Sequence, residues 1–264
     1  MRTVADVIDI ASAERRPPSD DVYELLAPVY DAFAQTIDYD AYASFIRTHE
    51  PEDTTAIGLF ACGTGRLLAT VANRYDTAVG FDRSPAMLSQ AATRTDAPLV
   101  IADLRTCVVP GRFDVVSILG NSLVHLDPQD NDPDPLHLAL SNAFESLQPG
   151  GVLLCDFIPP SSVIDGHVME AVATDGVYQI TRTIVTRVTN PDAGGFGPAG
   201  RYTYAYKIQN SRTNRTARMS ATAPIRGYRP AGVLRTALDV GFTEAALIDS
   251  PPELDEALVA RKPI

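Results

Sequence analysis

The sequence predicts an α/β protein built on a parallel, doubly wound sheet. Short apolar runs alternate with amphipathic segments through most of the 264 residues, a rhythm typical of strands joined by crossover helices. A glycine-rich loop follows the first apolar run, and 45% of the residues are hydrophobic, enough to form a sizeable core. We therefore expect a single domain over residues 1–264.

Five strands are expected before residue 160, and two more near the C-terminus. One intervening helix has a clear start signal, with Ser84 as N-cap and Pro85 in its first turn. A later helix is expected to stop at Gly241. The seven expected strands are residues 56–60, 77–82, 98–103, 112–119, 149–157, 243–249 and 256–263.

Two segments depart from this alternation. Residues 20–50 carry apolar residues at helical spacing over two stretches, which predicts two N-terminal helices. Residues 167–225 alternate apolar and polar side chains, as in VYQITRTIVTRV and RYTYAYKIQN, around a Gly- and Pro-rich joint. We expect this second segment to be an inserted antiparallel β cap, which covers the acceptor side of a site or contributes to a homodimer.

The charge and hydropathy of the chain argue against several partners. With 33 acidic and 22 basic residues, the formal net charge of -11 repels phosphate backbones, so no nucleic-acid partner is expected. No apolar run approaches the roughly 18 residues of a membrane-spanning helix. The N-terminus lacks the pattern of a secretory signal. The sequence thus predicts a cytoplasmic protein without a membrane partner.

The cysteines and histidines show no metal-binding spacing. The three cysteines are isolated and form no CxxC pair, and the four histidines form no HxH or HxxxH pair. We therefore expect no metal.

The loop ACGTG follows the first expected strand. Gly63 and Gly65 let the backbone approach a ligand closely. Asp82 ends the second strand, where a carboxylate can accept hydrogen bonds from both ribose hydroxyls. Asp103 ends the third strand, where an acid can accept from an adenine amine. Since ligands of open α/β sheets bind at the carboxyl ends of the strands, these groups together predict an adenosine-containing cofactor.

NAD is the main competing cofactor. Its fingerprint, GxGxxG, needs a third glycine for the pyrophosphate and for helix packing. Here Leu68 stands at that position. The pattern instead favours S-adenosylmethionine, which has no phosphate to bind.

The chain resembles the class I S-adenosylmethionine-dependent methyltransferases, and within them the small-molecule N-methyltransferases of the glycine N-methyltransferase type. The resemblance covers about residues 20 to 264. It implies a Rossmann-like, seven-stranded, mostly parallel sheet with an antiparallel last strand. The motifs that carry it are ACGTG, GFDRSPAML, ADL, FDVVSILGNSLVHL, LHLALSNAFESLQPGGVLLCDF and the antiparallel insertion before GFTEAALI.

The resemblance also implies roles for residues at the strand ends. The methionine part of the cofactor lies against the glycine loop, the ribose at Asp82 and the adenine beside the next two loops. Tyr30 and Tyr39 are candidates to close over the cofactor, although both equally suit plain helix packing. The implied cofactor residues are Tyr30, Ala61, Cys62, Gly63, Gly65, Asp82, Arg83, Met87, Asp103, Leu104, Leu119 and His125.

Two positions depart from the pattern of these relatives. Many carry an acid where this chain has Leu59, and that acid helps to hold the cofactor's ammonium. Glycine N-methyltransferases carry an arginine for the acceptor's carboxylate near the position of Ile158. Glycine is therefore a poor candidate acceptor, and a larger or less anionic small molecule fits better.

The expected activity is methyl transfer to a small-molecule acceptor by in-line displacement, at nitrogen first and at oxygen next. Such a reaction depends mainly on proximity and orientation. His125 is a candidate acid or base and Asn121 a candidate to orient the acceptor. His125 also suits a cofactor-side or structural role. Two alternatives stay open: a protein that binds S-adenosylmethionine without catalysis, and a methyltransferase acting on a macromolecule.

Overall fold

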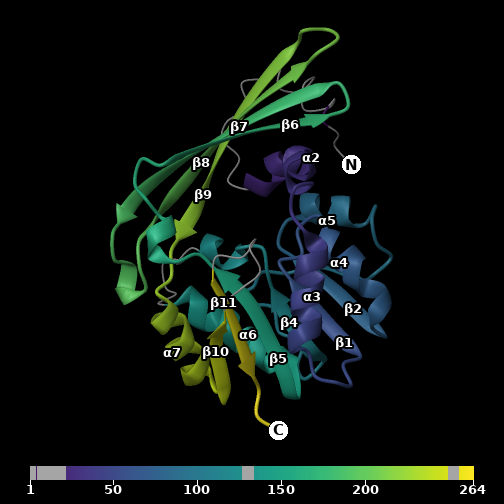
Figure 1. Cartoon of the computed structure of the whole chain (residues 1–264), viewed down its shortest axis with the longest axis vertical. Helices are drawn as coiled ribbons and strands as arrows, with labels where there is room; N and C mark the ends of the chain where they lie inside the picture. The colour runs from purple at the N-terminus through teal and green to yellow at the C-terminus, as the bar shows by residue number, and fades with distance from the viewer. Residues whose placement is uncertain (1–3, 5–21, 127–133, 249–255) are drawn as a thin grey trace.

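The computed structural model describes residues 4, 22–126, 134–248 and 256–264. Its main sheet has seven strands in the order β10-β11-β5-β4-β1-β2-β3 (Figure 1). Strands β1 to β5 are parallel to one another, whereas β11 is antiparallel to both β5 and β10. The predicted fold class is confirmed. The strands are β1 (Ala56–Phe60), β2 (Thr77–Asp82), β3 (Leu99–Ile101), β4 (Phe113–Ile118), β5 (Leu147–Phe157), β10 (Glu244–Ile248) and β11 (Glu256–Arg261).

Helices cover both faces of this sheet. On one face, α6 (Pro135–Ser146) and α7 (Pro230–Val240) bury apolar side chains against β1, β4 and β5. On the other, α3 (Tyr39–His49) and α4 (Arg66–Val71) do the same. Burial on both faces explains why the central strands are continuously apolar in sequence. None of the described helices is long and apolar enough to cross a lipid bilayer.

The helix α5 (Pro85–Ala91) begins as its sequence predicts. The Ser84 hydroxyl accepts a hydrogen bond from the Met87 N–H, and Pro85 occupies the first turn. Among the described residues there are also four short 3₁₀ helices, Ala72–Arg74 (η1), Ser122–His125 (η2), Pro160–Ser162 (η3) and Ala193–Gly195 (η4). One of them, η2, lies after β4, where the sequence predicted a loop.

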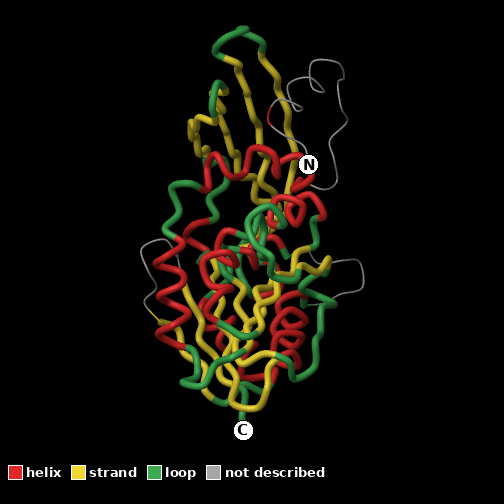
Figure 2. Tube along the Cα trace, turned by 90° about the vertical axis from the view of Figure 1, so that its right-hand side faces the viewer, coloured by secondary structure: helices red, strands yellow, loops and turns green. Residues whose placement is uncertain are grey.

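The insertion forms a second, four-stranded antiparallel sheet in the order β6-β7-β8-β9. It extends away from the main sheet as a long twisted ribbon (Figures 1 and 2). The helix α2 (Val22–Ala34) packs its apolar side against this ribbon and also contacts α5. The four strands are β6 (Val168–Asp175), β7 (Tyr178–Asn190), β8 (Ala199–Asn210) and β9 (Thr216–Arg226).

The inserted sheet and α2 together lie over the carboxyl edge of the main sheet. Residues that follow β1, β2, β3 and β4 line the same cavity as Arg182 of β7 and Tyr204 of β8. We call α2 and the cavity-facing side of the inserted sheet the roof, and the loops after β1 to β4 the floor. The site is the space between roof and floor.

Candidate active site

The first floor loop is held in left-handed backbone conformations. Ala61, Gly63 and Gly65 all have positive φ, at 58°, 56° and 75°. For an alanine this conformation costs about 1–2 kcal/mol, so the surrounding structure must enforce it. A Cβ at Gly63 would meet nothing within 4 Å, so Gly63 faces open space where a ligand can approach.

Gly65 has a packing role beside the cofactor role that the family resemblance implies. A Cβ built on it would lie 2.7 Å from the Cβ of Ala91 in α5. Gly65 is also absent from the described residues that line the cavities. The glycine is therefore required for packing between the start of α4 and α5, and a direct cofactor contact is not supported.

Asp82 connects the first two floor loops. Its carboxylate accepts hydrogen bonds from the Gly63 N–H at 2.8 Å and from the Ser84 N–H at 2.9 Å. The residue is 8% exposed and lines the cavity. Each carboxylate oxygen has a further lone pair beyond these bonds, so the group can also accept from ligand hydroxyls.

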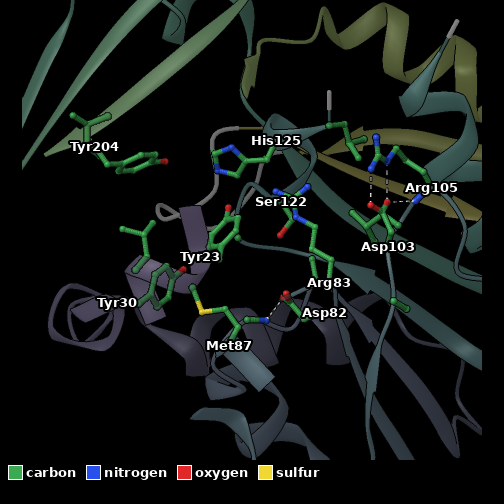
Figure 3. Close-up of a pocket in the computed structure, with 18 of the residues that line it drawn as sticks. Tyr23, Tyr30, Asp82, Arg83, Met87, Asp103, Arg105, Ser122, His125 and Tyr204 are labelled. Atoms are coloured by element: carbon green, nitrogen blue, oxygen red, sulfur yellow. Dashed lines mark hydrogen bonds and ion pairs between the residues drawn. The ribbon is translucent and has the colours of Figure 1, made fainter. Parts of the chain in front are cut away.

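Asp103 is paired with Arg105 on the third floor loop. Both carboxylate oxygens accept hydrogen bonds from the guanidinium, at 2.9 and 2.6 Å, as Figure 3 shows. Hydrogen bonding to Arg105 lowers the pKa of Asp103. Asp103 is therefore ionised near neutral pH and remains an acceptor.

The fourth floor loop is fixed by a residue that the sequence analysis did not single out. Asp156, fully buried near the end of β5, accepts hydrogen bonds from the N–H groups of Gly120 and Asn121 at 2.9 Å. Asn121 has a positive φ of 60°, and its side-chain oxygen is buried without a hydrogen-bond partner. A single Asp near the end of an otherwise apolar strand, as in VLLCDF, is the signal that could have revealed this role.

His125 marks the border between floor and roof. Its Nδ1 lies 2.9 Å from the carbonyl oxygen of Pro224 in β9. A carbonyl can only accept, so Nδ1 carries the proton and Nε2 is left as an acceptor. Burial lowers the pKa of His125 to about 4. The imidazole is therefore neutral at pH 7.

The roof contributes aromatic rings and one cation. The Tyr23 ring packs edge-on against His125 with centroids 5.8 Å apart, and Tyr204 points toward the space beside His125 (Figure 3). Burial raises the pKa of Tyr23 and raises that of Tyr206 to about 12, so both hydroxyls are protonated near pH 7. The Arg182 guanidinium lies over the Phe33 ring at 4.3 Å. Within the described part of the chain, no carboxylate forms a salt bridge with Arg182.

The site residues that the family resemblance implies, Gly65 excepted, line two adjoining cavities. The His125 cavity, about 240 Å³, reaches from Asp82 to the roof. The Cys62 cavity, about 400 Å³, lies against α3. Tyr30, Ala61 and Gly63 line both of them, so the cavities adjoin at these residues. The other implied residues divide between Asp82, Arg83, Met87, Asp103, Leu104 and His125 in the first, and Tyr39, Cys62, Leu119 and Asn121 in the second.

The two departures noted in the sequence have clear positions. Leu59 is 2% exposed and lines the Cys62 cavity. Ile158 is buried with Val124, Val163 and Ile225, between the main sheet and the insertion. A guanidinium does reach the His125 cavity, from Arg182 of the inserted sheet. Sequence reasoning missed Tyr23, Arg182, Tyr204 and Tyr206.

Comparisons with known proteins agree with this geometry. Residues 59–151 match the model of a family described as a methyltransferase domain. YqeM of Bacillus subtilis (strain 168), assigned as a methyltransferase, is 30% identical over 140 residues, which are 51% of this chain and about half, 55%, of that protein. The dTDP-3-amino-3,6-dideoxy-alpha-D-glucopyranose N,N-dimethyltransferase of Streptomyces fradiae is 29% identical over 193 residues, covering 70% of this chain and 71% of that one.

A solved structure extends the likeness beyond the matched domain. The SAM-bound CalS10, an amino pentose methyltransferase from Micromonospora echinaspora, superposes with a TM-score of 0.73 at 21% identity. The match covers 94% of this chain and 100% of CalS10, so the two share their fold, insertion included. The glycine loop after β1 and the carboxylate at the end of β2 both lie within the residues that match the methyltransferase domain. The chain therefore carries a methyltransferase domain over residues 59–151, within a fold that it shares with the SAM-bound CalS10.

Proposed function

We propose that this enzyme methylates the nitrogen of an amine on a small-molecule acceptor, and specifically of an amino sugar. The observation that carries the proposal is the neutral His125, whose Nε2 acceptor faces a cavity roofed by tyrosines. The names of the Streptomyces fradiae and Micromonospora echinaspora relatives, both of which specify amino sugars, support the same acceptor class.

We place the cofactor across the two cavities. Asp82 suits the ribose hydroxyls, because its carboxylate is a hydrogen-bond acceptor at the cavity wall. The adenine then lies between Met87 and Asp103, and the methionine part in the Cys62 cavity beyond Gly63. When bound, S-adenosylmethionine supplies a methyl group that the sulfonium already makes electrophilic. The residues present therefore fit this cofactor.

The remaining task of the chain is to orient the acceptor. An amine reacts through its lone pair, so it must be neutral, and no proton has to leave before the new bond forms. His125 Nε2 can accept a hydrogen bond from the amine N–H and so fix the direction of the lone pair. Tyr23 and Tyr204 exclude water on the roof side. Asn121 lies in the other cavity, so a role in orienting the acceptor is not supported for it.

An oxygen acceptor is the weaker candidate. A hydroxyl is a poor nucleophile until its proton is removed, which needs a base with a pKa near the working pH. The pKa of His125, about 4, makes it a weak base. Orientation of an amine requires only an acceptor, which His125 provides in its neutral form. A macromolecular acceptor is also disfavoured, because α2 and the inserted sheet cover the His125 cavity.

Arg182 further suggests an acceptor with an anionic group. A guanidinium without a carboxylate partner in a described cavity wall suits a phosphate or carboxylate of a ligand. The acceptor in the name of the Streptomyces fradiae relative is a nucleotide-linked sugar, which carries such groups. Of the two alternatives that the sequence left open, a larger or a less anionic acceptor, this favours the larger one.

The test is a methyl-transfer screen with purified protein. Amino sugars, free and nucleotide-linked, are compared with analogues that carry a hydroxyl in place of the amine, and products are measured by mass spectrometry. We expect one or two added methyl groups on the amine series and none on the hydroxyl series. Methylation of hydroxyl analogues alone would contradict the proposal. Calorimetric titration with S-adenosylhomocysteine, run in parallel, tests cofactor binding independently and addresses the non-catalytic alternative.

The predicted homodimer also stays a proposal, as does the cytoplasmic location. Support for a dimer comes from the inserted sheet, where Val168 and Val172 of β6 are 51% and 62% exposed, next to Ile164 at 56%. Exposed apolar side chains on an edge strand favour association. Sedimentation analysis of the full chain distinguishes monomer from dimer.

A further inference from the structure

A single carboxylate joins the roof helix to the floor loop. Asp31, near the end of α2, accepts a hydrogen bond from the Thr64 hydroxyl at 2.8 Å and from Nε of Arg66 at 2.9 Å. Its second oxygen accepts from Nη2 of Arg94. Three residues from two segments of the chain, the β1–α4 connection and the loop after α5, thus converge on one residue of α2.

Thr64 is held at both of its polar ends. Its hydroxyl binds Asp31, and its carbonyl oxygen accepts from Nη1 of Arg94 at 2.8 Å. Thr64 is 2% exposed and stands between Gly63 and Gly65, the two left-handed glycines of the loop. The cluster of Asp31, Arg66 and Arg94 therefore fixes the middle of the loop through a residue whose own side chain is shielded from solvent.

The charged groups of this cluster are shielded from solvent. The side chain of Asp31 is 19% exposed, and those of Arg66 and Arg94 are each 25% exposed. Charge-assisted hydrogen bonds in such surroundings are stronger than exposed ion pairs. The cluster can therefore hold a loop conformation that its backbone dihedrals alone do not favour.

Asp31 is also coupled to the roof through its neighbour. Tyr30 lines both cavities, and α2 buries Val22, Leu26 and Val29 against the inserted sheet and Met87. A shift of Asp31 therefore moves Tyr30 relative to the floor loop. The glycine loop and the roof helix α2 are therefore held together at one residue, Asp31. An ion pair on the surface, away from the site, would not link these two elements.

We infer that Asp31 is a positioning residue for cofactor binding, which acts through Thr64 on the glycine loop and through Tyr30 on the roof. The inference rests on the proposed placement of the cofactor against this loop. Asp31 is not among the described residues that line either cavity, so it makes no direct ligand contact. Its effect on affinity is transmitted by the two residues that it holds.

The test compares Asp31→Asn with two substitutions of its partner. Thr64→Val keeps the shape of the side chain but removes the hydroxyl, whereas Thr64→Ser keeps the hydroxyl. We expect Asp31→Asn and Thr64→Val each to raise the Kd for S-adenosylhomocysteine roughly tenfold, the scale of a lost charge-assisted hydrogen bond. Thr64→Ser should stay within about threefold of the wild type. The double variant Asp31→Asn/Thr64→Val should lose less binding free energy for S-adenosylhomocysteine than the two single variants lose together, since both substitutions break the same contact.

A purely structural role would give a different result. The matched control is Asp192→Asn, which breaks the ion pair between Asp192 and Arg229, whose side chains are 54% and 47% exposed. It should leave the Kd unchanged. Thermal unfolding without ligand reports stability separately, and in turnover the KM for the cofactor should rise more than kcat falls. Folded Asp31→Asn protein that binds S-adenosylhomocysteine as tightly as the wild type would overturn the inference. Failure of the wild type to bind would instead contradict the proposed cofactor site.

Discussion

The floor and the roof of the site are built by different kinds of contact. On the floor, buried or half-buried carboxylates bind backbone N–H groups: Asp82 binds those of Gly63 and Ser84, and Asp156 binds that of Gly120. On the roof, the contacts are between side chains, such as Arg182 over Phe33. The floor is therefore rigid through its main chain, whereas the roof can change with single side-chain substitutions.

Under the proposed function, this difference separates the residues that bind the cofactor from those that bind the acceptor. A ligand common to a whole family needs a fixed geometry, which the loops at the strand ends provide. An acceptor that varies between relatives can be accommodated by residues of an insertion. Substitutions on the floor should then affect cofactor affinity, and substitutions on the roof should affect acceptor affinity, with little crossover.

The largest effect is expected from Asp82→Ala. The change removes the proposed ribose contact and leaves the N–H groups of Gly63 and Ser84 without their acceptor. We expect the Kd for S-adenosylhomocysteine to rise by about 100-fold or more, since several charge-assisted hydrogen bonds are lost together. Calorimetric titration measures this. A Kd within threefold of the wild type, in protein with an unchanged circular dichroism spectrum, would show that Asp82 does not hold the cofactor.

The floor was largely accessible to sequence reasoning because its residues follow apolar strands at fixed positions. Gly63, Asp82 and Asp103 were found by their places after three successive strands, and all three line the His125 cavity. Gly65 has a packing reason for being glycine, the close approach of Ala91 in α5, and no local pattern in the sequence reveals this contact. Sequence position identifies the loop but does not show which of its glycines faces the ligand.

The sequence predicted the antiparallel strands of the roof but not which of their side chains line the cavity. Alternation over residues 167–225 indicated antiparallel strands, yet it did not show that Arg182 and Tyr204 face the cavity. Neighbouring strands decide this through their register: Arg182 pairs with Tyr206, and both point to the side that α2 covers. Register between strands about twenty residues apart in sequence depends on the whole sheet, so one sequence without structure cannot supply it.

A medium effect, confined to the acceptor, is expected from Arg182→Met. Methionine keeps much of the packing over Phe33 but removes the charge. We expect the KM for a nucleotide-linked acceptor to rise roughly tenfold, with the Kd for S-adenosylhomocysteine within about twofold of the wild type. Steady-state kinetics and calorimetry separate the two. The matched control is Arg187→Met on the same strand, whose side chain is 69% exposed and faces the other side of the sheet. Equal effects from both variants would argue against a specific contact at Arg182.

The smallest effect concerns the pH dependence of stability at the border between floor and roof. Burial lowers the pKa of His125 to about 4, below the 6.5 of the unfolded chain. As the pH falls from about 6.5 to 4, the unfolded state takes up a proton that the native state does not, so His125 contributes a loss of stability in that window. Between pH 7 and pH 5, we expect the free energy of unfolding to fall by about 1 kcal/mol more in the wild type than in His125→Asn. The effect is kept to this size because the imidazole lines a cavity that water can enter. Thermal and chemical unfolding at several pH values measure this.

His49 supplies the comparison that makes this result specific to the site. Burial also lowers the pKa of His49, but the residue lies at the end of α3 and lines neither cavity among those described. His49→Asn should therefore reduce the acid sensitivity of unfolding in the same direction, whether or not ligands are present. For His125 the presence of an acceptor should matter, because an amine bound at Nε2 stabilises the neutral imidazole further and widens the difference between wild type and variant. An acceptor that instead leaves the contribution of His125 to the pH dependence of unfolding unchanged, as is expected for His49, would show that Nε2 does not contact the amine. The proposed orienting role of His125 would then fail, whereas the proposed cofactor site on the floor would be unaffected.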